Sequence, residues 1–217
     1  TASGTLSDGS KVIVNADGTV SVVAQTETTG PGDGEATVYE SAGTYFASAT
    51  YDSTNQKVVL AYRGTSNYGT AIVGTVSGNS ITFGTPVVFE SANAIYNSIV
   101  YDSANQKVVI AYADNGNSGY GTAIVGTVSG TSISFGSPVV YTSSDANYVT
   151  ATYDSTNQKV VIAYQDVGNS NYGTAVVGTV SGTSISFGTP VVFNTAYSVF
   201  EQATFDSTNG KVVIAYQ

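Results

Sequence analysis

The sequence predicts an all-β protein, specifically a β-propeller built from four-stranded blades. Three observations lead to this prediction: a unit of about fifty residues recurs, each unit contains four strand-like stretches, and no stretch has the 3.6-residue apolar period of a helix. The second strand-like stretch of each unit is apolar at nearly every position, so both of its faces must be covered. Sheets that stack face to face around an axis provide that cover, and this is the arrangement of a β-propeller.

The repeat is easiest to follow at its first turn, where Asp-Ser-Thr-Asn-Gln-Lys or a close variant follows an aromatic residue. Successive copies are 50, 52 and 52 residues apart, and the aromatic residue is Tyr51, Tyr101, Tyr153 and Phe205. The motif Gly-Thr-Ala-(Ile/Val)-Val-Gly-Thr-Val-Ser-Gly starts at positions 69, 121 and 173, and Phe-Gly-(Thr/Ser)-Pro-Val-Val starts at positions 83, 135 and 187. The chain is therefore a repeat array of three copies and partial ends.

The third copy shows how the four strands are predicted in order. Residues 149–153 alternate in polarity, a turn follows, and residues 159–164 are apolar on both faces. A loop over 165–171 leads to a third strand at 174–180, and a Ser-Gly turn leads to a fourth at 184–193. Pro190 marks the fourth strand as an edge, because proline cannot donate to a hydrogen-bonded ladder.

The two chain ends predict how the ring of blades closes. Residues 18–24 align with the third strand of a blade and residues 35–40 with the end of a fourth, whereas residues 200–217 supply only two first strands. We therefore expect one repeat domain, residues 1–217, with four blades. Full blades lie at 46–92, 96–141 and 148–193, and the fourth is shared between 1–45 and 198–217. Small residues in the inner strands, such as those at 47–50, agree with a narrow axis.

A chain cut from a larger ring is the alternative to closure within these residues. The sequence contains no Met, which is typical of a processed or excerpted chain. On the closed interpretation, residues 11–14 form an extra strand, and residues 15–18 form its hairpin turn.

Composition excludes several classes of function. Six Lys plus Arg and fifteen Asp plus Glu give a net charge of −9, which disfavours binding to nucleic acid and to anionic membranes. The chain has no Cys and no His, so disulfides, thiolate chemistry and the commonest general base are absent. No apolar run approaches the ~18 residues of a membrane span. We expect no cofactor, with calcium at a surface site left open.

The copies agree on one face of the predicted ring and differ on the other. The turn after the first strand is nearly identical throughout, with its aspartate at Asp52, Asp102, Asp154 and Asp206. This turn and the Ser-Gly turn share one face. The other face carries the approach to the first strand and the loop after the second, which varies between segments 63–67, 113–119 and 165–171. We interpret the variable face as the ligand-binding face, with unselected drift as the alternative.

The repeated turn is interpreted as structural. It lacks the EF-hand pattern for calcium, which requires Gly at the sixth position and a later Glu. In the structural interpretation Asp caps the turn, Asn or Gly takes the positive φ, and Lys lies opposite Asp across the hairpin.

An aromatic residue precedes every inner strand at one blade position, namely Phe46, Tyr96, Tyr148 and Phe200. It is either a packing residue between blades or one of a ring of platforms for sugar faces. Irregular polar residues near the same face either bond sugar hydroxyls or are ordinary solvated loop residues: Arg63, Asn97, Asp114, Asp145, Asp166, Glu201 and Gln202. The candidate ligand-binding residues are Arg63, Tyr96, Asn97, Asp114, Tyr148, Asp166 and Glu201.

The repeat over residues 153–193 resembles repeats in virion structural and tail-fibre proteins of marine bacteriophages. The resemblance rests on the repeat motifs above and on residues 3–23, which are similar to the lead-in of such repeat regions. It implies an extracellular place on the virion surface and contact with a host cell or with neighbouring virion subunits. It brings no catalytic residues, and bacterial surface proteins are an alternative source of similar repeats.

Three functions of different classes follow. The first is a non-enzymatic module that binds a host-surface glycan or protein, the second is a structural spacer in a fibre or decoration layer, and the third is a glycan hydrolase. A hydrolase needs two carboxylates about 5–10 Å apart. Asp114 and Asp166 hold equivalent loop positions, Glu201 has no evident partner, and no nucleophile elbow is present. We therefore predict a binding protein, not an enzyme.

Overall fold

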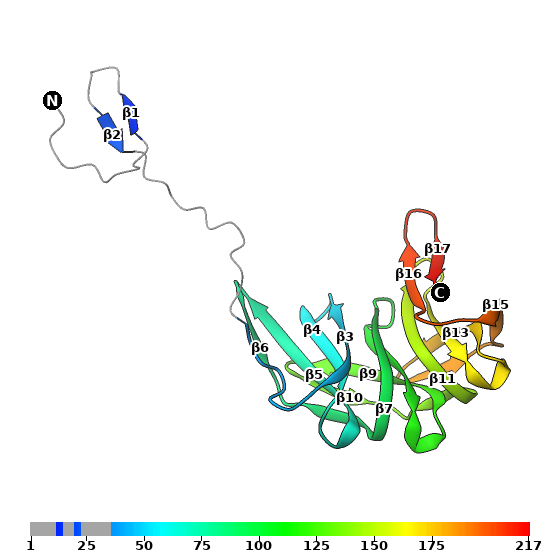
Figure 1. Cartoon of the computed structure of the whole chain (residues 1–217). Helices are drawn as coiled ribbons and strands as arrows, with labels where there is room; N and C mark the ends of the chain where they lie inside the picture. The colour runs from blue at the N-terminus through cyan, green and yellow to red at the C-terminus, as the bar shows by residue number, and fades with distance from the viewer. Residues whose placement is uncertain (1–11, 15–19, 23–35) are drawn as a thin grey trace. The chain divides into compact units, whose positions relative to one another are not determined.

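The structure is a computed structural model, and it describes residues 12–14, 20–22 and 36–217. These residues belong to two separate parts, divided after residue 35 (Figure 1). In the N-terminal part, β1 (Val12–Val14) pairs antiparallel with β2 (Val20–Val22). The extra strand expected at residues 11–14 is thus present over Val12–Val14. The hairpin turn predicted at 15–18 and most of the strand predicted at 18–24 lie outside the described residues.

The second part, residues 36–217, consists of three successive repeats and a C-terminal hairpin. Repeat A contains β3 (Tyr45–Asp52), β4 (Lys57–Arg63), β5 (Tyr68–Ser77), β6 (Ser80–Phe83) and the start of β7 (Val87–Asp102). Repeat B contains the rest of β7, then β8 (Lys107–Asp114), β9 (Tyr120–Ser129), β10 (Ser132–Phe135) and the start of β11 (Val139–Asp154). Repeat C contains the rest of β11, then β12 (Lys159–Asp166), β13 (Tyr172–Ser181), β14 (Ser184–Phe187) and β15 (Val191–Tyr197). The C-terminal hairpin is β16 (Gln202–Asp206) and β17 (Lys211–Ala215).

The all-β prediction is confirmed. Across the described ranges there is no α-helix, and the only helical segments are three short 3-10 turns between the second and third strands: η1 (Thr65–Asn67), η2 (Asn115–Asn117) and η3 (Val167–Asn169). Within the part of the chain that the structure describes, no helix is long and apolar enough to cross a membrane.

Within each repeat the strands pair antiparallel in sequence order. In repeat A, β4 pairs with β3 and β5, and β5 pairs with both β6 and the start of β7. The fourth position of each sheet is therefore filled by two pieces. The single strand predicted at 184–193 is divided in the same way into β14 and β15, because the Gly-Thr-Pro segment 188–190 interrupts it and Pro190 has no N–H to donate.

Two long strands join the repeats without an intervening loop. β7 pairs with β5 through its first half and with β8 through its second half, and β11 likewise pairs with β9 and β12 (Figure 1). Thirteen strands are linked in this way into one antiparallel sheet, while β16 and β17 form a separate two-stranded sheet. The approaches to the first strand of repeats B and C therefore lie within β7 and β11.

The core lies between successive repeats, and the sheet of the middle repeat B is covered on both faces. Val108 and Val109 point to opposite faces of β8, and both are fully buried. Val108 packs in a cluster with Val59 of repeat A, and Val109 packs in a cluster with Val160 of repeat C. Burying a valine fully contributes about 1.5–3 kcal/mol, so these shared clusters bind each repeat to its neighbours.

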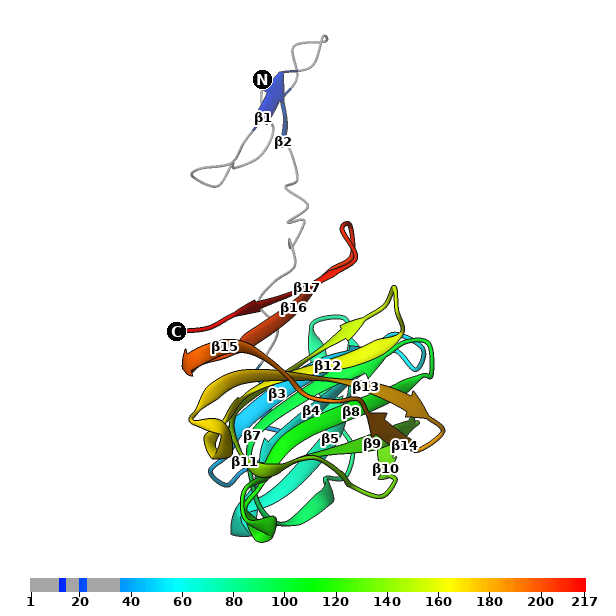
Figure 2. The same ribbon diagram turned by 90° about the vertical axis from the view of Figure 1, so that its right-hand side faces the viewer.

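The first strands of the repeats lie side by side in an open arc (Figures 1 and 2): β3 lies against β7, β7 against β11, and β11 against β16. Among the described residues, β3 pairs only with β4, β17 pairs only with β16, and β2 pairs with β1. The closure of a ring through the chain ends therefore stays a prediction.

Candidate functional site

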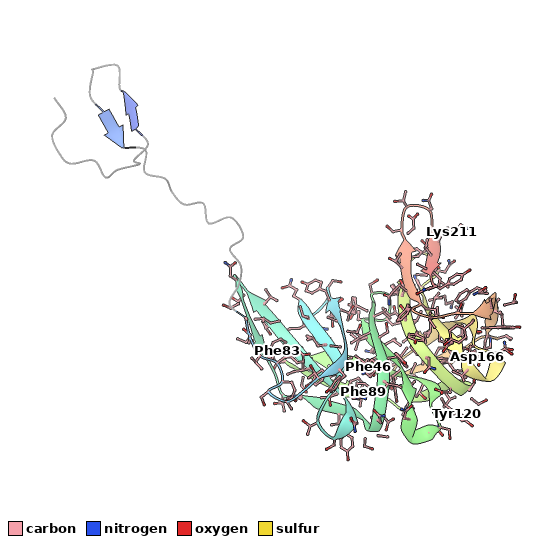
Figure 3. All side chains as sticks on the ribbon, in the orientation of Figure 1. Phe46, Phe83, Phe89, Tyr120, Asp166 and Lys211 are labelled. Carbon is pink, nitrogen blue, oxygen red and sulfur yellow. The ribbon has the colours of Figure 1, made fainter. Side chains whose placement is uncertain are left out.

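The strand register divides residues 36–217 into two edges with different properties. We call the edge with the turns between first and second strands the turn edge; Asp52 lies there, opposite Lys57. The loop edge is at the other end of the same strands, where Tyr45 lies opposite Arg63 and η1, η2 and η3 follow the second strands. Figure 3 labels Lys211 near the turn of the C-terminal hairpin and Tyr120 and Asp166 at the loop edge. The approach to the first strand and the variable loop thus share an edge, as predicted.

The turn edge is held together by its own side chains. In repeat B, Oδ1 of Asp102 accepts hydrogen bonds from the backbone N–H groups of Ala104 and Asn105 at 3.0 and 3.1 Å, and Oδ2 accepts one from the Asn105 side chain at 2.7 Å. The turns of repeats A and C and of the C-terminal hairpin repeat this pattern. The capping role predicted for the aspartate is confirmed.

The positive φ predicted for this turn is confirmed at Gly210, but the prediction was wrong for the asparagine of the other copies. The positive φ falls on the residue after the asparagine, which is Gln56, Gln106, Gln158 and Gly210 in successive copies. The asparagine instead uses its side-chain amide to bond the aspartate. These bonds stabilise the charged carboxylate and hold the pKa of Asp154 and Asp206 below the usual range of an aspartate. The turn is thus explained by bonds within the chain.

Four aromatic rings form a continuous row at the loop edge, which we call the aromatic row: Phe46, Tyr96, Tyr148 and Phe200. Successive ring centroids lie 5.1, 5.2 and 5.0 Å apart, with the planes tilted by 56°, 42° and 58°. Tyr96 and Tyr148 are half-buried, whereas Phe46 and Phe200 at the ends are 38% and 62% exposed. The rings therefore pack against one another and still present surface to solvent (Figure 3 labels Phe46).

The backbone of the aromatic row is strained in every copy. All four residues have positive φ, with values of 51°, 54°, 50° and 59° along the row. The first three lie where the first strand bulges against the second. Glycine is the favoured residue at such a position, and a left-handed conformation costs an L-residue about 1–2 kcal/mol. Repeated backbone strain is found at functional sites, where surrounding contacts hold it in place.

A cation lies at one end of the aromatic row. The guanidinium carbon of Arg63 is 4.5 Å from the ring centroid of Tyr45 and 5.1 Å from that of Phe46, within the range of a cation–π interaction. One guanidinium nitrogen also donates to Oδ1 of Asn93 at 3.3 Å. Tyr45 was missed by the sequence reasoning. It could have been found, because it immediately precedes Phe46 and opposes Arg63 in the antiparallel pair.

Two of the candidate residues are buried and not exposed to solvent. Asn97 and Glu201 follow row members directly, at the position occupied by Ala47 and Val149 in the other copies, and they are 6% and 1% exposed. No other residue of the described ranges bonds either amide atom of Asn97 or either carboxylate oxygen of Glu201. Burial raises the pKa of Glu201.

The loop aspartates are engaged within their own loops. Oδ1 of Asp114 accepts from the N–H of Gly116 at 2.9 Å and begins η2, and Oδ1 of Asp166 accepts from the N–H of Asn169 at 3.3 Å and begins η3. The two residues lie in different repeats. Their geometry is that of helix N-caps.

Two further polar residues, Asp145 and Gln165, lie near the aromatic row. Asp145, at the start of the approach to the first strand of repeat C, lies close enough to Tyr96 to contribute to its raised pKa, of which burial is the largest cause. Gln165 was not among the selected residues, yet it is buried and joins two segments, since it accepts from the Asn147 side chain and donates to the carbonyl of Ser198. The structure therefore places Arg63, Tyr96 and Tyr148 at one continuous surface. Of the remaining candidates, Asn97 and Glu201 are buried, and Asp114 and Asp166 cap their own loops.

Comparisons with known proteins identify a fold relative only. No protein-family model matches the chain, and no curated protein matches it. The chain is similar in structure to the lectin SapL1, solved in complex with α-methyl fucoside, with a TM-score of 0.50 and 16% sequence identity. The match covers 80% of this chain but 56% of the lectin chain, so this chain spans little more than half of that protein. At this identity the likeness concerns the β fold alone.

Proposed function

We propose that this protein is a non-enzymatic module that binds glycans at its loop edge, with the aromatic row as the contact surface. The observation that carries the proposal is the row itself: four partly exposed rings in contact, each on a strained backbone at the same position of its repeat. Sugars present C–H faces that pack well against aromatic rings, and Tyr96 and Tyr148 add hydroxyl groups for hydrogen bonding.

Two further observations support a sugar ligand. Arg63 and Asn93 supply hydrogen-bonding groups at one end of the aromatic row, beside the exposed ring of Tyr45. The fold relative described above is a lectin bound to a methyl fucoside, which makes an α-fucoside a reasonable first ligand to test.

The proposed scaffold is a β-propeller in which each repeat is a four-stranded blade. Burial of both faces of β8 between neighbouring sheets supports this arrangement, as does the side-by-side packing of the first strands. In this proposal the ring has four blades, and the fourth is shared between residues 1–45 and 198–217.

We further propose that the protein acts on a virion surface, as a host-binding part of a tail fibre or similar structure. The resemblance of the repeats to marine bacteriophage virion proteins supports this location, as does the net charge of −9, which disfavours nucleic acid as the partner. The non-enzymatic character is supported by Asp114 and Asp166, whose carboxylates each cap a loop of their own repeat.

The test is a glycan array followed by titration calorimetry with the best glycan and with methyl α-fucoside. We expect binding, and we expect Tyr96→Ala and Tyr148→Ala each to weaken it by at least ~10-fold, because each removes a ring from the centre of the row. Val76→Ala is the control, since Val76 is an exposed apolar residue at the turn-edge end of β5 and should leave the affinity unchanged.

The results separate the three classes of function. Absence of binding to any glycan, or unchanged affinity in both row variants, would refute the proposal and favour the structural spacer. Release of reducing sugar from a bound polysaccharide would instead identify a hydrolase.

A further inference from the structure

Neighbouring first strands are joined by the same hydrogen bond at every step of the arc. A side-chain oxygen on one first strand accepts from a backbone N–H on the next. The pairs are Ser48 with Ile99 at 3.2 Å, Ser98 with Ala151 at 2.9 Å, and Thr150 with Ala203 at 3.2 Å. In the C-terminal hairpin the residue equivalent to Ser48, Ser98 and Thr150 is Gln202. In repeat A the residue equivalent to the N–H donors is Ala49.

The turn edge carries a second contact between neighbours. The hydroxyl of Tyr101 donates to Oγ1 of Thr54 in the preceding repeat at 2.6 Å, and the hydroxyl of Tyr153 accepts from the N–H of Ala104 in the preceding repeat at 3.3 Å. Phe205 of the hairpin has no hydroxyl for the equivalent bond. Tyr51 of repeat A has one, and its side chain is 55% exposed.

The two ends of the arc expose the surfaces that every internal step buries. On β3, Ala49 is exposed, whereas its equivalents Ile99 and Ala151 are buried against the preceding first strand. On β16, Gln202 is exposed, whereas its equivalent Thr150 is buried. Each end thus presents one half of an interface that occurs three times within the structure.

Residues 36–40 already occupy part of a further repeat that precedes repeat A. The Tyr39 ring packs 5.1 Å from Tyr62 and 6.0 Å from Phe83, just as Phe89 packs 5.3 Å from Tyr112 and 5.8 Å from Phe135 at the next step. The local bond is the same too, since Glu40 accepts from the N–H of Ala42 and Glu90 from that of Ala92, both at 3.0 Å. Residues 36–40 therefore stand where a fourth strand belongs.

We infer that the C-terminal hairpin docks against β3 of its own chain and makes a fourth copy of the step between first strands. At this interface the side-chain oxygen of Gln202 accepts from the N–H of Ala49, the Tyr51 hydroxyl bonds Thr208, and Phe200 packs on Phe46. The inference rests on the proposed propeller and deepens it, because it names the contacts that close the ring and turn the aromatic row into a closed ring of four.

The same chain is the favoured occupant of the β3 surface for two reasons. The exposed faces of β3 and β16 complement each other within one chain, because one offers the backbone N–H and the other the side-chain oxygen of the repeated bond. A segment tethered to the same chain has an effective concentration on the order of millimolar. A second copy would have to overcome the mutual repulsion of two chains that each carry −9.

The experiment uses the fact that the full chain contains no cysteine. Ala49→Cys is combined with Gln202→Cys, and Ser98→Cys with Ala151→Cys is the positive control, because that pair belongs to a step already in contact. After mild oxidation, we expect the test variant to form an intrachain disulfide in most chains, as the control does, seen as a reducible shift of the monomer band and as a linked peptide by mass spectrometry.

Two outcomes would overturn the inference. Disulfide-linked dimers or ladders from the test variant would identify a second copy as the occupant. Free thiols in the test variant under conditions that oxidise the control would mean that the ends stay apart. Glycan binding by Tyr96 and Tyr148 is measured on the same protein, so that loss of closure and loss of the proposed binding function can be told apart.

Discussion

The turn edge and the loop edge are built from the same strands, yet they differ in hydrogen bonding and in how much the copies vary. At the turn edge each aspartate is bonded three times within its own turn, and the copies are nearly identical. At the loop edge the copies share an aromatic position and differ in almost everything else. Asn97 and Glu201 are buried there, and their side chains have no hydrogen-bond partner among residues 12–14, 20–22 and 36–217. Uniform residues here stabilise the fold, whereas the variation is concentrated around the exposed rings.

The difference gives a physical basis for assigning binding to one edge. A segment whose donors and acceptors are satisfied internally has little left to offer a ligand. The aromatic row keeps its ring surface partly exposed and its backbone strained. Strain of this kind is typical of sites where it has a function, and contacts with a ligand would offset its free-energy cost.

The largest expected effect comes from removing one aspartate at each edge. Asp102→Ala should lower the free energy of unfolding by about 2–3 kcal/mol, because it removes a buried carboxylate and the three bonds that it accepts from the turn. Asp114→Ala should cost under about 1 kcal/mol, because it removes one bond from an exposed loop. Urea unfolding of the two variants measures both values, and equal losses would contradict the division into two edges.

The carboxylates of the two edges should respond to pH in opposite directions. The lowered pKa of Asp154 means that its stabilising effect is present above pH 3.8, the ordinary value, and is lost as the pH falls through the folded-state pKa. The raised pKa of Glu201 means that the folded state prefers its protonated form, so stability is lost as the pH rises above 4.5 towards and through the folded-state pKa.

Glu201→Gln tests this second effect. The substitution removes an unpaired buried charge and should raise the free energy of unfolding at pH 7 by about 1 kcal/mol. The gain should disappear near pH 4, where Glu201 is protonated in both states. Thermal melts of the wild type and the variant across this range provide the measurement, and a gain that is independent of pH would show that charge is not its cause.

The smallest expected effect concerns the positive φ at the turn edge. Gln106→Gly should stabilise the protein by roughly 0.5 kcal/mol, because glycine adopts φ 56° without strain, and the fourth copy already has Gly210 at this position. Gly210→Gln should destabilise by a similar amount. Urea midpoints are sufficient to compare the two. A destabilising Gln106→Gly or a stabilising Gly210→Gln would show that strain at this position is negligible.

Much of the fold could be predicted because each repeat carries the same apolar runs and turn residues. Strands such as Lys159–Asp166 follow from an apolar run bounded by turn residues, and the role of Asp102 follows from ordinary turn chemistry. The continuous course of β7 could not be predicted, since the segment 93–96 lacks an apolar pattern and is held in strand conformation by pairing with β5 and β8.

The candidate site was predicted in part for the same reason. Phe46, Tyr96, Tyr148 and Phe200 were visible as a repeated position, but their mutual contact depends on how far apart the sheets stand, which single-strand patterns do not contain. Burial of Glu201 was also beyond the pattern, because an isolated carboxylate is normally expected at the surface.

The strands shared between repeats, β7 and β11, have a consequence for how such arrays change in length. An excision that starts and ends at equivalent positions, for example the 52 residues from 96 to 147, rejoins the front of one shared strand to the back of the next. Each remaining ladder then keeps its partners, and no linker has to be redesigned. Recombination between copies can therefore add or delete whole modules, and with each module the protein gains or loses one ring of the aromatic row.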